Sequence, residues 1–356
     1  MDLFILLLAA GILLLILLIR SPGKLKQFKD KEGNVIMNSI KEKAFVKING
    51  VRMGMIIEGK DSSNPVLLII HGGPGMPEYF MNEKYPAGFN EFFTTVWWDQ
   101  RGAGLSYSSD ISETTMTSEQ FVSDIIEVSK YLSKQFHQEK IYLLGHSWGT
   151  FIAIQAASRA PELYHAYIGV SQMVKQEESE KIAYEYMLDY YNQTGDKRTV
   201  RRLEKHPVNT AGYDTIRDAV MHKAGIGTMR KMTSVITGIF IPSLMNTEYT
   251  LTEKINLWKG KASPKLKALK EERNRTDISS KIKTLDLPVY FLSGVFDYTV
   301  NYKISEAYLK ELSAPVKGFY LFEKSAHSPI FEESDKVRRI MLEDVLQDGN
   351  SLADIK

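Results

Sequence analysis

The sequence contains no cysteine at any of its 356 positions. A disulfide, a thiolate-ligated metal site and a cysteine nucleophile are therefore excluded. An excess of charge of one sign is also lacking, because 45 Lys and Arg residues stand against 43 Asp and Glu residues. A field this weak does not indicate a nucleic-acid partner, so small-molecule chemistry is the default expectation. No group of His and carboxylate residues has the spacing of metal ligands, and we expect neither a metal nor a cofactor.

Long apolar runs are lacking except for one at the N-terminus. Leu3–Ile19 is unbroken and would extend about 25 Å as a helix, which predicts a transmembrane anchor over residues 1–20. Asp2 precedes the run and no small-residue cleavage site follows it, so we favour an uncleaved anchor over the alternative, a signal peptide. Basic residues between positions 20 and 31 predict, by the positive-inside rule, that the rest of the chain lies in the cytoplasm.

The remainder has a globular composition, with 44% hydrophobic and 25% charged residues, and predicts one α/β domain with an insertion. After a linker over residues 21–43, two apolar segments joined by Asn49-Gly50 predict a β-hairpin. Short apolar runs then alternate with helical segments, which favours a mostly parallel sheet flanked by helices. The expected strands lie at 44–48, 52–57, 66–70, 95–98, 141–144, 166–170, 289–292 and 319–322.

One long insertion interrupts this alternation. No strand pattern occurs from 173 to 283, which predicts a helical lid between two parts of the core, at 44–172 and 284–350. The Lys-rich stretch Lys259–Lys270 within the lid indicates a solvated helix face. The clearest amphipathic helix lies in the core at 117–137, where Thr117 and Gln120 are placed as a capping box.

One serine lies in a motif that carries chemistry. Gly145-His146-Ser147-Trp148-Gly149 fits G-x-S-x-G, with the strand-like IYLLG before it and the helix-like TFIAIQAASRA after it. This context predicts a nucleophile elbow, a sharp strand-to-helix turn that holds the hydroxyl of Ser147 clear of the backbone. The side chain of His146 should point away from that of Ser147, so we expect a packing role for it.

A serine hydroxyl needs a base to take its proton and an acid to orient that base. Asp297 follows the apolar run VYFLSG and His327 follows GFYLF, so both lie after late strands in the chain order serine, acid, base. We therefore predict Ser147, Asp297 and His327 as a catalytic triad. Asp286 is the competing acid, but it precedes its strand and is expected to be a turn residue at the opposite edge of the sheet.

A glycine-rich loop is the expected source of oxyanion stabilisation. His71-Gly72-Gly73-Pro74-Gly75 follows the run VLLII, and such a loop can bring a backbone N–H up to a developing oxyanion. We predict the N–H groups of Gly73 and Trp148 as the oxyanion hole. The alternative is an ordinary tight turn, whereas a phosphate loop is excluded because no G-K-[ST] ending follows.

Three ordered motifs carry a family resemblance, namely HGGPG at 71–75, WDQRGAGLS at 98–106 and GHSWG at 145–149. With the loops of Asp297 and His327 they resemble the proline iminopeptidase group of α/β-hydrolases. The resemblance implies the α/β-hydrolase fold and release of an N-terminal residue, typically proline, from peptides, with lid carboxylates holding the substrate amine. Arg101, in the second motif, is expected to be structural. The candidate lid carboxylates, whose spacing equally fits a solvated helix face, are Glu177, Glu178, Glu180, Glu185 and Asp189.

Three functions stay open at this point. The leading hypothesis is a serine hydrolase that cleaves an amide or ester bond of a small molecule or short peptide through an acyl-enzyme. The second is a membrane-associated esterase or lipase, which the apolar N-terminus and the Met- and Tyr-rich lid favour. The third is a non-catalytic binding protein on the same fold, which the intact motifs argue against. The sequence does not indicate an oligomeric state.

Overall fold

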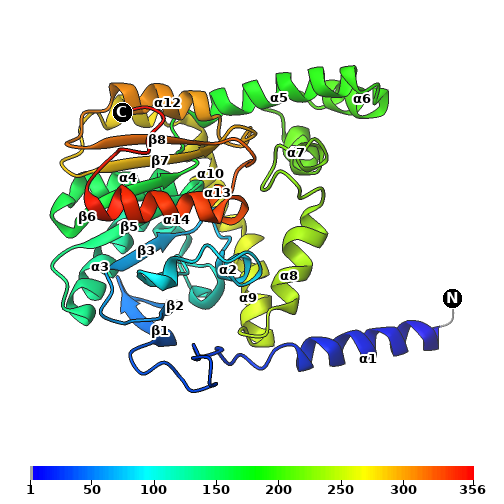
Figure 1. The fold of residues 1–356 in the computed structure, drawn as a ribbon. Helices are drawn as coiled ribbons and strands as arrows, with labels where there is room; N and C mark the ends of the chain where they lie inside the picture. The colour runs from blue at the N-terminus through cyan, green and yellow to red at the C-terminus, as the bar shows by residue number, and fades with distance from the viewer. Residues whose placement is uncertain (1–2) are drawn as a thin grey trace.

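A single eight-stranded sheet forms the centre of the protein in the computed structural model, which describes residues 3–356 (Figure 1). The strand order is β1-β2-β4-β3-β5-β6-β7-β8. β2 pairs antiparallel with both β1 and β4, and the other neighbours pair parallel, so the predicted mostly parallel sheet is confirmed. The strands are β1 (Ile40–Ile48), β2 (Val51–Gly59), β3 (Val66–Ile70), β4 (Thr94–Trp98), β5 (Ile141–His146), β6 (Tyr164–Val170), β7 (Val289–Gly294) and β8 (Lys317–Phe322).

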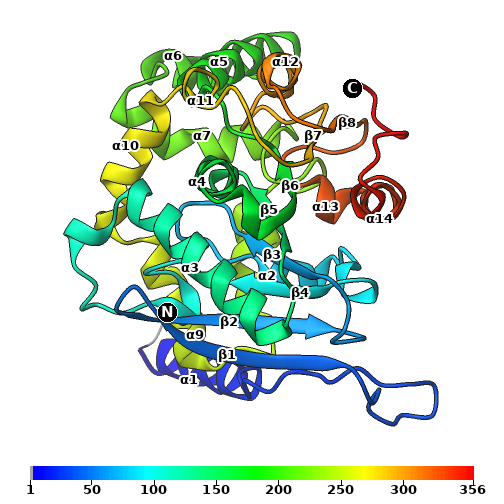
Figure 2. The ribbon, with the colours of Figure 1, turned by 90° about the vertical axis from the view of Figure 1, so that its left-hand side faces the viewer.

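The central strands are buried on both faces, which explains why their sequences are apolar without alternation. Every residue of β3, β5 and β7 is buried. One apolar cluster joins one face of the sheet to α3, α4 and α12, and a second joins the other face to α2 and α14 (Figure 2). These helices are α2 (Tyr79–Lys84), α3 (Ser118–Phe136), α4 (Trp148–Arg159), α12 (Tyr302–Glu311) and α14 (Ser334–Glu343), with the short α13 (Pro329–Glu332) before the last.

The turn between β1 and β2 forms as predicted, and the predicted capping box at the start of α3 forms in part. The hairpin between β1 and β2 turns at Asn49 and Gly50, both with positive φ (45° and 81°), as a type I′ turn requires. At the start of α3, the Thr117 hydroxyl accepts from the Gln120 backbone N–H at 3.2 Å. The reciprocal half of the predicted capping box is absent, because the Gln120 side chain instead donates to Asp124 at 2.9 Å.

The chain between β6 and β7 is helical and lies beside the carboxyl ends of the strands (Figure 1). It has a small apolar core of its own, in which Met187, Leu203 and Val220 from three successive helices are buried together. These three helices pack on one another, whereas α9, α10 and α11 join the two clusters that cover the sheet through Leu257, Leu269 and Ile278. Its elements are α5 (Gln176–Gln193), α6 (Lys197–Lys205), α7 (Ala211–Lys223), the π-helical turn η5 (Ile236–Phe240), α8 (Ile241–Met245), α9 (Leu251–Lys261), α10 (Lys267–Arg275) and α11 (Ile278–Lys281).

The N-terminal apolar run forms α1 (Leu3–Ile19), which projects away from the domain (Figure 1). The predicted transmembrane anchor is not supported, since no helix within residues 3–356 is long and apolar enough to cross a membrane. The cytoplasmic location stays a prediction.

Candidate active site

Ser147 occupies the sharp turn between β5 and α4, as the G-x-S-x-G motif predicts. Its backbone has φ 54° and ψ −122°, a conformation that costs a non-glycine residue about 1–3 kcal/mol. Hydrogen bonds hold the turn, because Ser147 N–H donates to Val170 O at 3.0 Å and Thr150 N–H donates to Ser147 O at 2.8 Å. Gly149 is required here, since a Cβ at that position would lie 1.9 Å from Ile70 O.

Asp297 and His327 come together at the carboxyl ends of β7 and β8. The Nδ1 of His327 donates to Asp297 Oδ2 at 2.9 Å, while Oδ1 of this fully buried carboxylate accepts two backbone N–H groups, from Thr299 and Val300. With Nδ1 as the donor, Nε2 of a neutral imidazole is left as a proton acceptor. No hydrogen bond joins Ser147 to His327 in the structure, and such catalytic contacts are often formed only once substrate binds.

The loop of His327 is held by a partly buried acid, Glu332, which no sequence motif indicated. Glu332 accepts the backbone N–H of Ala326 at 2.8 Å and that of Arg230 at 2.6 Å, which ties the loop to the lid. Burial raises the pKa of Glu332 to about 7, against the lowering effect of these N–H groups. Asp286, the competing acid, is exposed before β7 and takes no part in the site.

His146 does not have the predicted packing role. Its Nδ1 donates to Glu78 Oε1 at 2.7 Å and its Nε2 donates to the backbone oxygen of His327 at 2.9 Å. Because both acceptors are oxygens, the ring is an imidazolium. Burial disfavours this charge, but the neighbouring carboxylate outweighs burial and raises the pKa of His146, and the same pairing lowers the pKa of Glu78. An ion pair therefore lies directly beneath the nucleophile turn.

Glu78 also braces the glycine-rich loop, because its Oε1 accepts the Gly72 N–H at 3.0 Å. Within residues 3–356, neither Gly73 N–H nor Trp148 N–H has a hydrogen-bond acceptor in the protein. Gly73 has a φ of 122° and a Cβ there would lie 2.8 Å from Gly75 N, so only glycine fits. Both predicted oxyanion donors therefore lack a hydrogen-bond acceptor within the described part of the protein.

The side chain of Gln100 connects the two segments that carry these donors. The sequence motifs did not predict this contact. Its side-chain amide donates to His71 O at 2.7 Å and accepts from the Trp148 indole at 2.9 Å. The His71 ring is neutral, because burial lowers its pKa to about 4 and its Nε2 accepts the Gln100 backbone N–H. The only available signal was the position of Gln100 inside the WDQRGAGLS motif.

Arg101 is structural, as expected. Its guanidinium makes a bidentate pair with Asp124 of α3, at 2.7 Å and 2.8 Å, and both side chains are buried. The carboxylate also accepts from Asn49 at 2.8 Å in the β1–β2 turn. This pair therefore fixes the turn after β4 against helix α3 and the β1–β2 hairpin.

A cavity of about 710 Å³ contains Ser147 and His327 on its wall, between the sheet and the lid. This volume suits a drug-sized or short peptide ligand, for which pockets of roughly 300–1,000 Å³ are typical. Gly73 and Glu78 lie on the same wall. Among the described residues, no group of three or more His, Asp and Glu side chains is placed to hold a metal ion.

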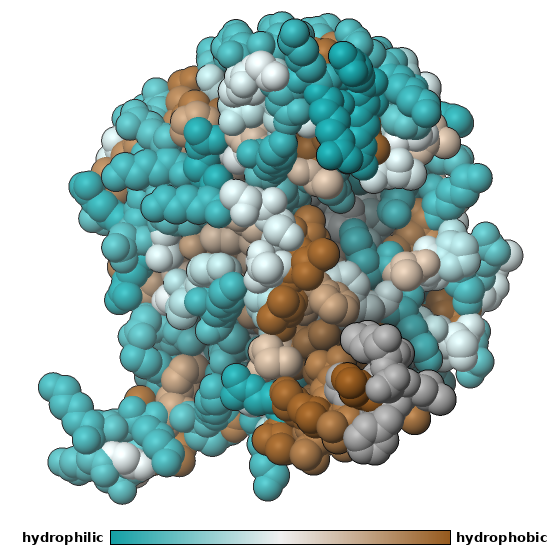
Figure 3. All heavy atoms as spheres, turned by 90° about the vertical axis from the view of Figure 1, so that its right-hand side faces the viewer, coloured by the Kyte–Doolittle hydropathy of each residue, from teal (hydrophilic) through white to brown (hydrophobic). Residues whose placement is uncertain are grey.

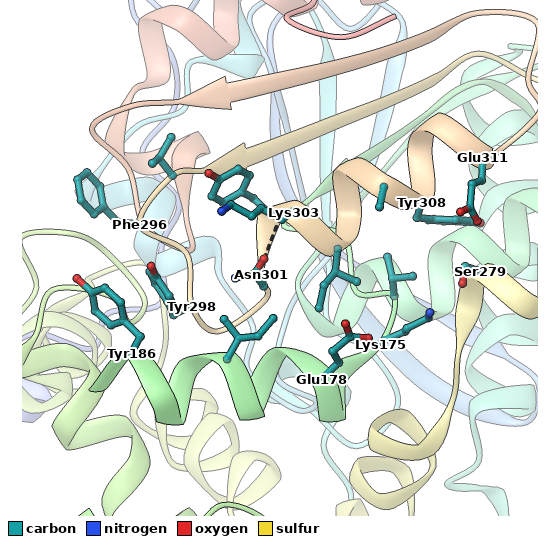
Figure 4. A pocket seen from close by; sticks show the side chains of 16 residues that line it. Lys175, Glu178, Tyr186, Ser279, Phe296, Tyr298, Asn301, Lys303, Tyr308 and Glu311 are labelled. Carbon is teal, nitrogen blue, oxygen red and sulfur yellow. Dashed lines mark hydrogen bonds between the residues drawn. The ribbon is translucent and has the colours of Figure 1, made fainter. Parts of the chain in front are cut away.

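The candidate lid carboxylates divide between two hollows and the surface. Glu177 and Glu180 line the cavity of Ser147, whereas Glu185 and Asp189 are exposed. Glu180 is already occupied, because its Oε2 accepts from Arg217 at 2.6 Å. Glu178 lines a separate hollow of about 640 Å³ between α5 and α12, shown in Figure 4 with Tyr186 and Tyr298 on its wall. That hollow contains neither Ser147 nor His327.

Comparison with known proteins agrees with this geometry. A family model described as the alpha/beta hydrolase fold matches residues 65–334. The chain belongs to the α/β-hydrolase family. As an α/β-hydrolase it is similar to Bacillus subtilis YbaC, which is named a probable aminopeptidase, with 32% identity over 81% of this chain and 91% of that protein.

Other similarities of this α/β-hydrolase agree with the predicted resemblance to proline iminopeptidases. A proline iminopeptidase of Heyndrickxia coagulans is 20% identical over 82% of the chain and 94% of that protein. The crystal structure of a proline iminopeptidase from Mycobacterium smegmatis superposes with a TM-score of 0.61 at 15% identity, covering 86% of this chain and 98% of that one. The latter likeness shows the fold alone, and the protein is a hydrolase by family.

Proposed function

We propose that this α/β-hydrolase is a serine hydrolase that releases the N-terminal residue of short peptides, as an aminopeptidase of the proline iminopeptidase type. The observation that carries the proposal is the wall of the 710 Å³ cavity, which includes Ser147, Gly73 and His327, the last of them hydrogen-bonded to Asp297. The backbone N–H groups of Gly73 and of Trp148, the residue after Ser147, have no acceptor within the described chain. The aminopeptidase names of the relatives support the substrate class.

Each of these groups has a role in the proposed chemistry. Ser147 Oγ attacks the scissile carbonyl carbon while His327 Nε2 takes its proton, and Asp297 stabilises the imidazolium that forms. The backbone N–H groups of Gly73 and Trp148 donate to the carbonyl oxygen as it becomes an oxyanion. His327 then gives the proton to the leaving amine, which leaves an acyl-enzyme on Ser147. Water, deprotonated by His327, attacks the acyl carbon and releases the acid and free serine.

An aminopeptidase also needs a carboxylate that binds the free amine of the substrate close to the scissile bond. We propose that Glu78 has this role. Its Oε1 bonds Gly72 and His146, but its Oε2 is buried and has no hydrogen-bond partner within the described chain. The carboxylate lies beside the nucleophile, since a Cβ on Gly72 would be 2.9 Å from Glu78 Oε1 and 3.2 Å from Ser147 Cβ. The substrate ammonium would give Oε2 the donor it lacks.

A second candidate is an esterase that acts on apolar acyl groups. Ile239 of η5 lines the cavity, while its neighbours Ile236, Phe240 and Ile241 are exposed. Figure 3 shows apolar side chains gathered on this face, above α1. An apolar entrance of this kind would favour an uncharged acyl chain over a peptide with a free amine.

The nucleophile is tested with a fluorophosphonate probe and with Ser147→Ala. We expect the wild type to be labelled and the variant to lose labelling and roughly 10⁴-fold or more in kcat, because the nucleophile acts as a unit with its base. Unchanged turnover in the variant would refute the mechanism.

The substrate class is tested with prolyl and alanyl arylamides, their N-acetyl forms and acyl esters of several chain lengths. We expect the free-amine arylamides to be preferred, and Glu78→Gln to reduce kcat/KM for them about tenfold while changing ester hydrolysis much less. The ester serves as the internal control, since damage to the ion pair with His146 would reduce both reactions equally. Turnover of the esters alone would favour the esterase.

A further inference from the structure

The cavity wall carries cations that the hydrolytic mechanism does not use. Lys261 is the last residue of α9, and Lys270 and Arg273 lie three residues apart on α10. All three line the cavity together with Ser147. Because residues three apart share a helix face, α10 presents both of its cations to one side. Two helices thus direct positive charge into the chamber that holds the nucleophile.

Lys261 lies close to the glycine-rich loop. Its neighbour Gly260 packs directly on the turn after β4, since a Cβ on Gly260 would lie 2.6 Å from Gly102 O. The oxygen of Gly260 also lies 3.3 Å from the position that a Cβ on Gly75 would take. Besides burial, which has the larger effect, the charge of Lys261 helps to lower the pKa of His71. The cation is therefore placed within electrostatic reach of the site of chemistry.

Two lid carboxylates on the cavity wall are held by another cation, Arg217. Arg217 bonds Glu180 at 2.6 Å and Asp218 at 2.8 Å. In contrast, Lys261 has no ion pair or hydrogen bond to any residue of the described chain, and the guanidinium of Arg273 bonds only the amide oxygen of Asn274, at 3.0 Å and 2.6 Å. Two partly buried cations on the cavity wall therefore lack a directly bonded carboxylate, and Asp218 and Glu180 act on them only from a longer distance.

Unpaired cations removed from water are unfavourable unless a ligand supplies the opposite charge. Burial lowers the pKa of Lys261 to about 8 and that of Arg273 to about 10, although Asp218 near Lys261 and Glu180 near Arg273 act in the opposite direction. The expectation that Lys259–Lys270 is a solvated helix face is therefore wrong for Lys261, because α9 packs on the loops around Ser147 and directs this residue inward.

We propose that Lys261 and Arg273 bind a carboxylate of the substrate. The inference rests on the proposed function and narrows it to peptides that carry a carboxylate near the scissile bond. Such a carboxylate has two sources, the free C-terminus of a very short peptide or the side chain of an acidic residue. A guanidinium and an ammonium together match the two oxygens of a carboxylate in either case.

The experiment measures binding rather than turnover, so that it stays informative if the proposed peptidase activity fails. Pro-Phe, Pro-Phe-amide and Pro-Glu-amide are titrated calorimetrically into the Ser147→Ala protein, which still has the cavity but cannot turn substrate over. We expect at least one carboxylate-bearing peptide to bind about tenfold or more tightly than Pro-Phe-amide, as a charge-assisted hydrogen bond implies. Preference for Pro-Phe identifies the C-terminus, and preference for Pro-Glu-amide identifies a side chain.

Lys261→Met and Arg273→Met, each added to Ser147→Ala, should reduce that preference to within about twofold, and Lys261→Arg should retain most of it. Lys259→Met is the matched control, because Lys259 lies two residues earlier on α9, is exposed and is outside the cavity. Urea unfolding of every variant confirms that it folds. The proposal is overturned if neither acid is preferred over Pro-Phe-amide, or if the preference survives both methionine variants.

The outcome is distinguishable from a failure of the proposed function. Wild-type protein that turns over no peptide, while the Ser147→Ala protein prefers the acids, would reject the aminopeptidase activity and keep the carboxylate subsite. If the wild type turns over peptides but the Ser147→Ala protein does not prefer the acids to the amide, the aminopeptidase activity is kept and the carboxylate subsite is rejected.

Discussion

Replacing Gln100 by leucine should loosen the oxyanion loop and destabilise the fold together. The Gln100 amide is buried, and it joins His71 O to the Trp148 indole at 2.7 Å and 2.9 Å. Leucine has nearly the same volume but fills neither hydrogen-bonding role. One buried indole N–H and one buried carbonyl are left without their partner, each at a cost of about 1–3 kcal/mol. We expect a loss of about 2–6 kcal/mol in the free energy of unfolding.

The measurement is urea unfolding followed by tryptophan fluorescence and by circular dichroism, with kcat recorded on a substrate that the wild type turns over. Gln100→Glu is the informative control, because it still accepts from the Trp148 indole but turns a carboxylate oxygen toward His71 O. A double-mutant cycle with Trp148→Phe isolates the indole bond, for which we expect a coupling of about 0.5–3 kcal/mol. Stability of Gln100→Leu within 1 kcal/mol of the wild type would refute the bridging role.

Two further predictions concern buried charges. Asp124→Asn leaves the buried guanidinium of Arg101 without its counter-charge and should reduce the free energy of unfolding by about 3–5 kcal/mol in chemical denaturation; a loss below 1 kcal/mol would show that the pair is dispensable. Glu332 has a folded pKa of about 7, above its usual 4.5, so it contributes stability below pH 4.5 that is lost as the pH rises through 7. Glu332→Gln should therefore gain up to about 3 kcal/mol relative to the wild type between pH 4.5 and pH 8, whereas a pH-independent difference would contradict the shift.

Much of this architecture is determined locally, and that is why the sequence predicted it. Strands buried on both faces must be apolar throughout, so β3, β5 and β7 are recognisable as short unbroken runs. The turn of Ser147 needs glycine on both sides, because a Cβ at Gly145 would lie 2.8 Å from Thr150 and one at Gly149 would meet Ile70. Asp297 and His327 are brought together because parallel strands place their carboxyl ends at one edge of the sheet.

The apolar run over residues 3–19 forms the helix α1, but no helix within residues 3–356 is long and apolar enough to cross a membrane, so the predicted anchor is not supported. The second half of the predicted capping box at the start of α3 also did not form. The Gln120 side chain donates to Asp124 instead of to the backbone of Thr117. Asp124 is held in place by hydrogen bonds from Arg101 and Asn49, which lie on other elements of the fold.

The contacts that define specificity were decided by tertiary structure alone. Glu78 meets His146 across 68 residues and Gln100 meets Trp148 across 48, distances over which no local pattern carries a signal. Lys261 lines the cavity and Lys259 does not, although both are lysines of α9. The packing of Gly260 on Gly102 sets which side of α9 faces the cavity. The sequence by itself determined the fold and the order of its reactive residues, because those depend on local sterics and strand order. The surroundings of the nucleophile depend on long-range packing, and only the folded chain decides them.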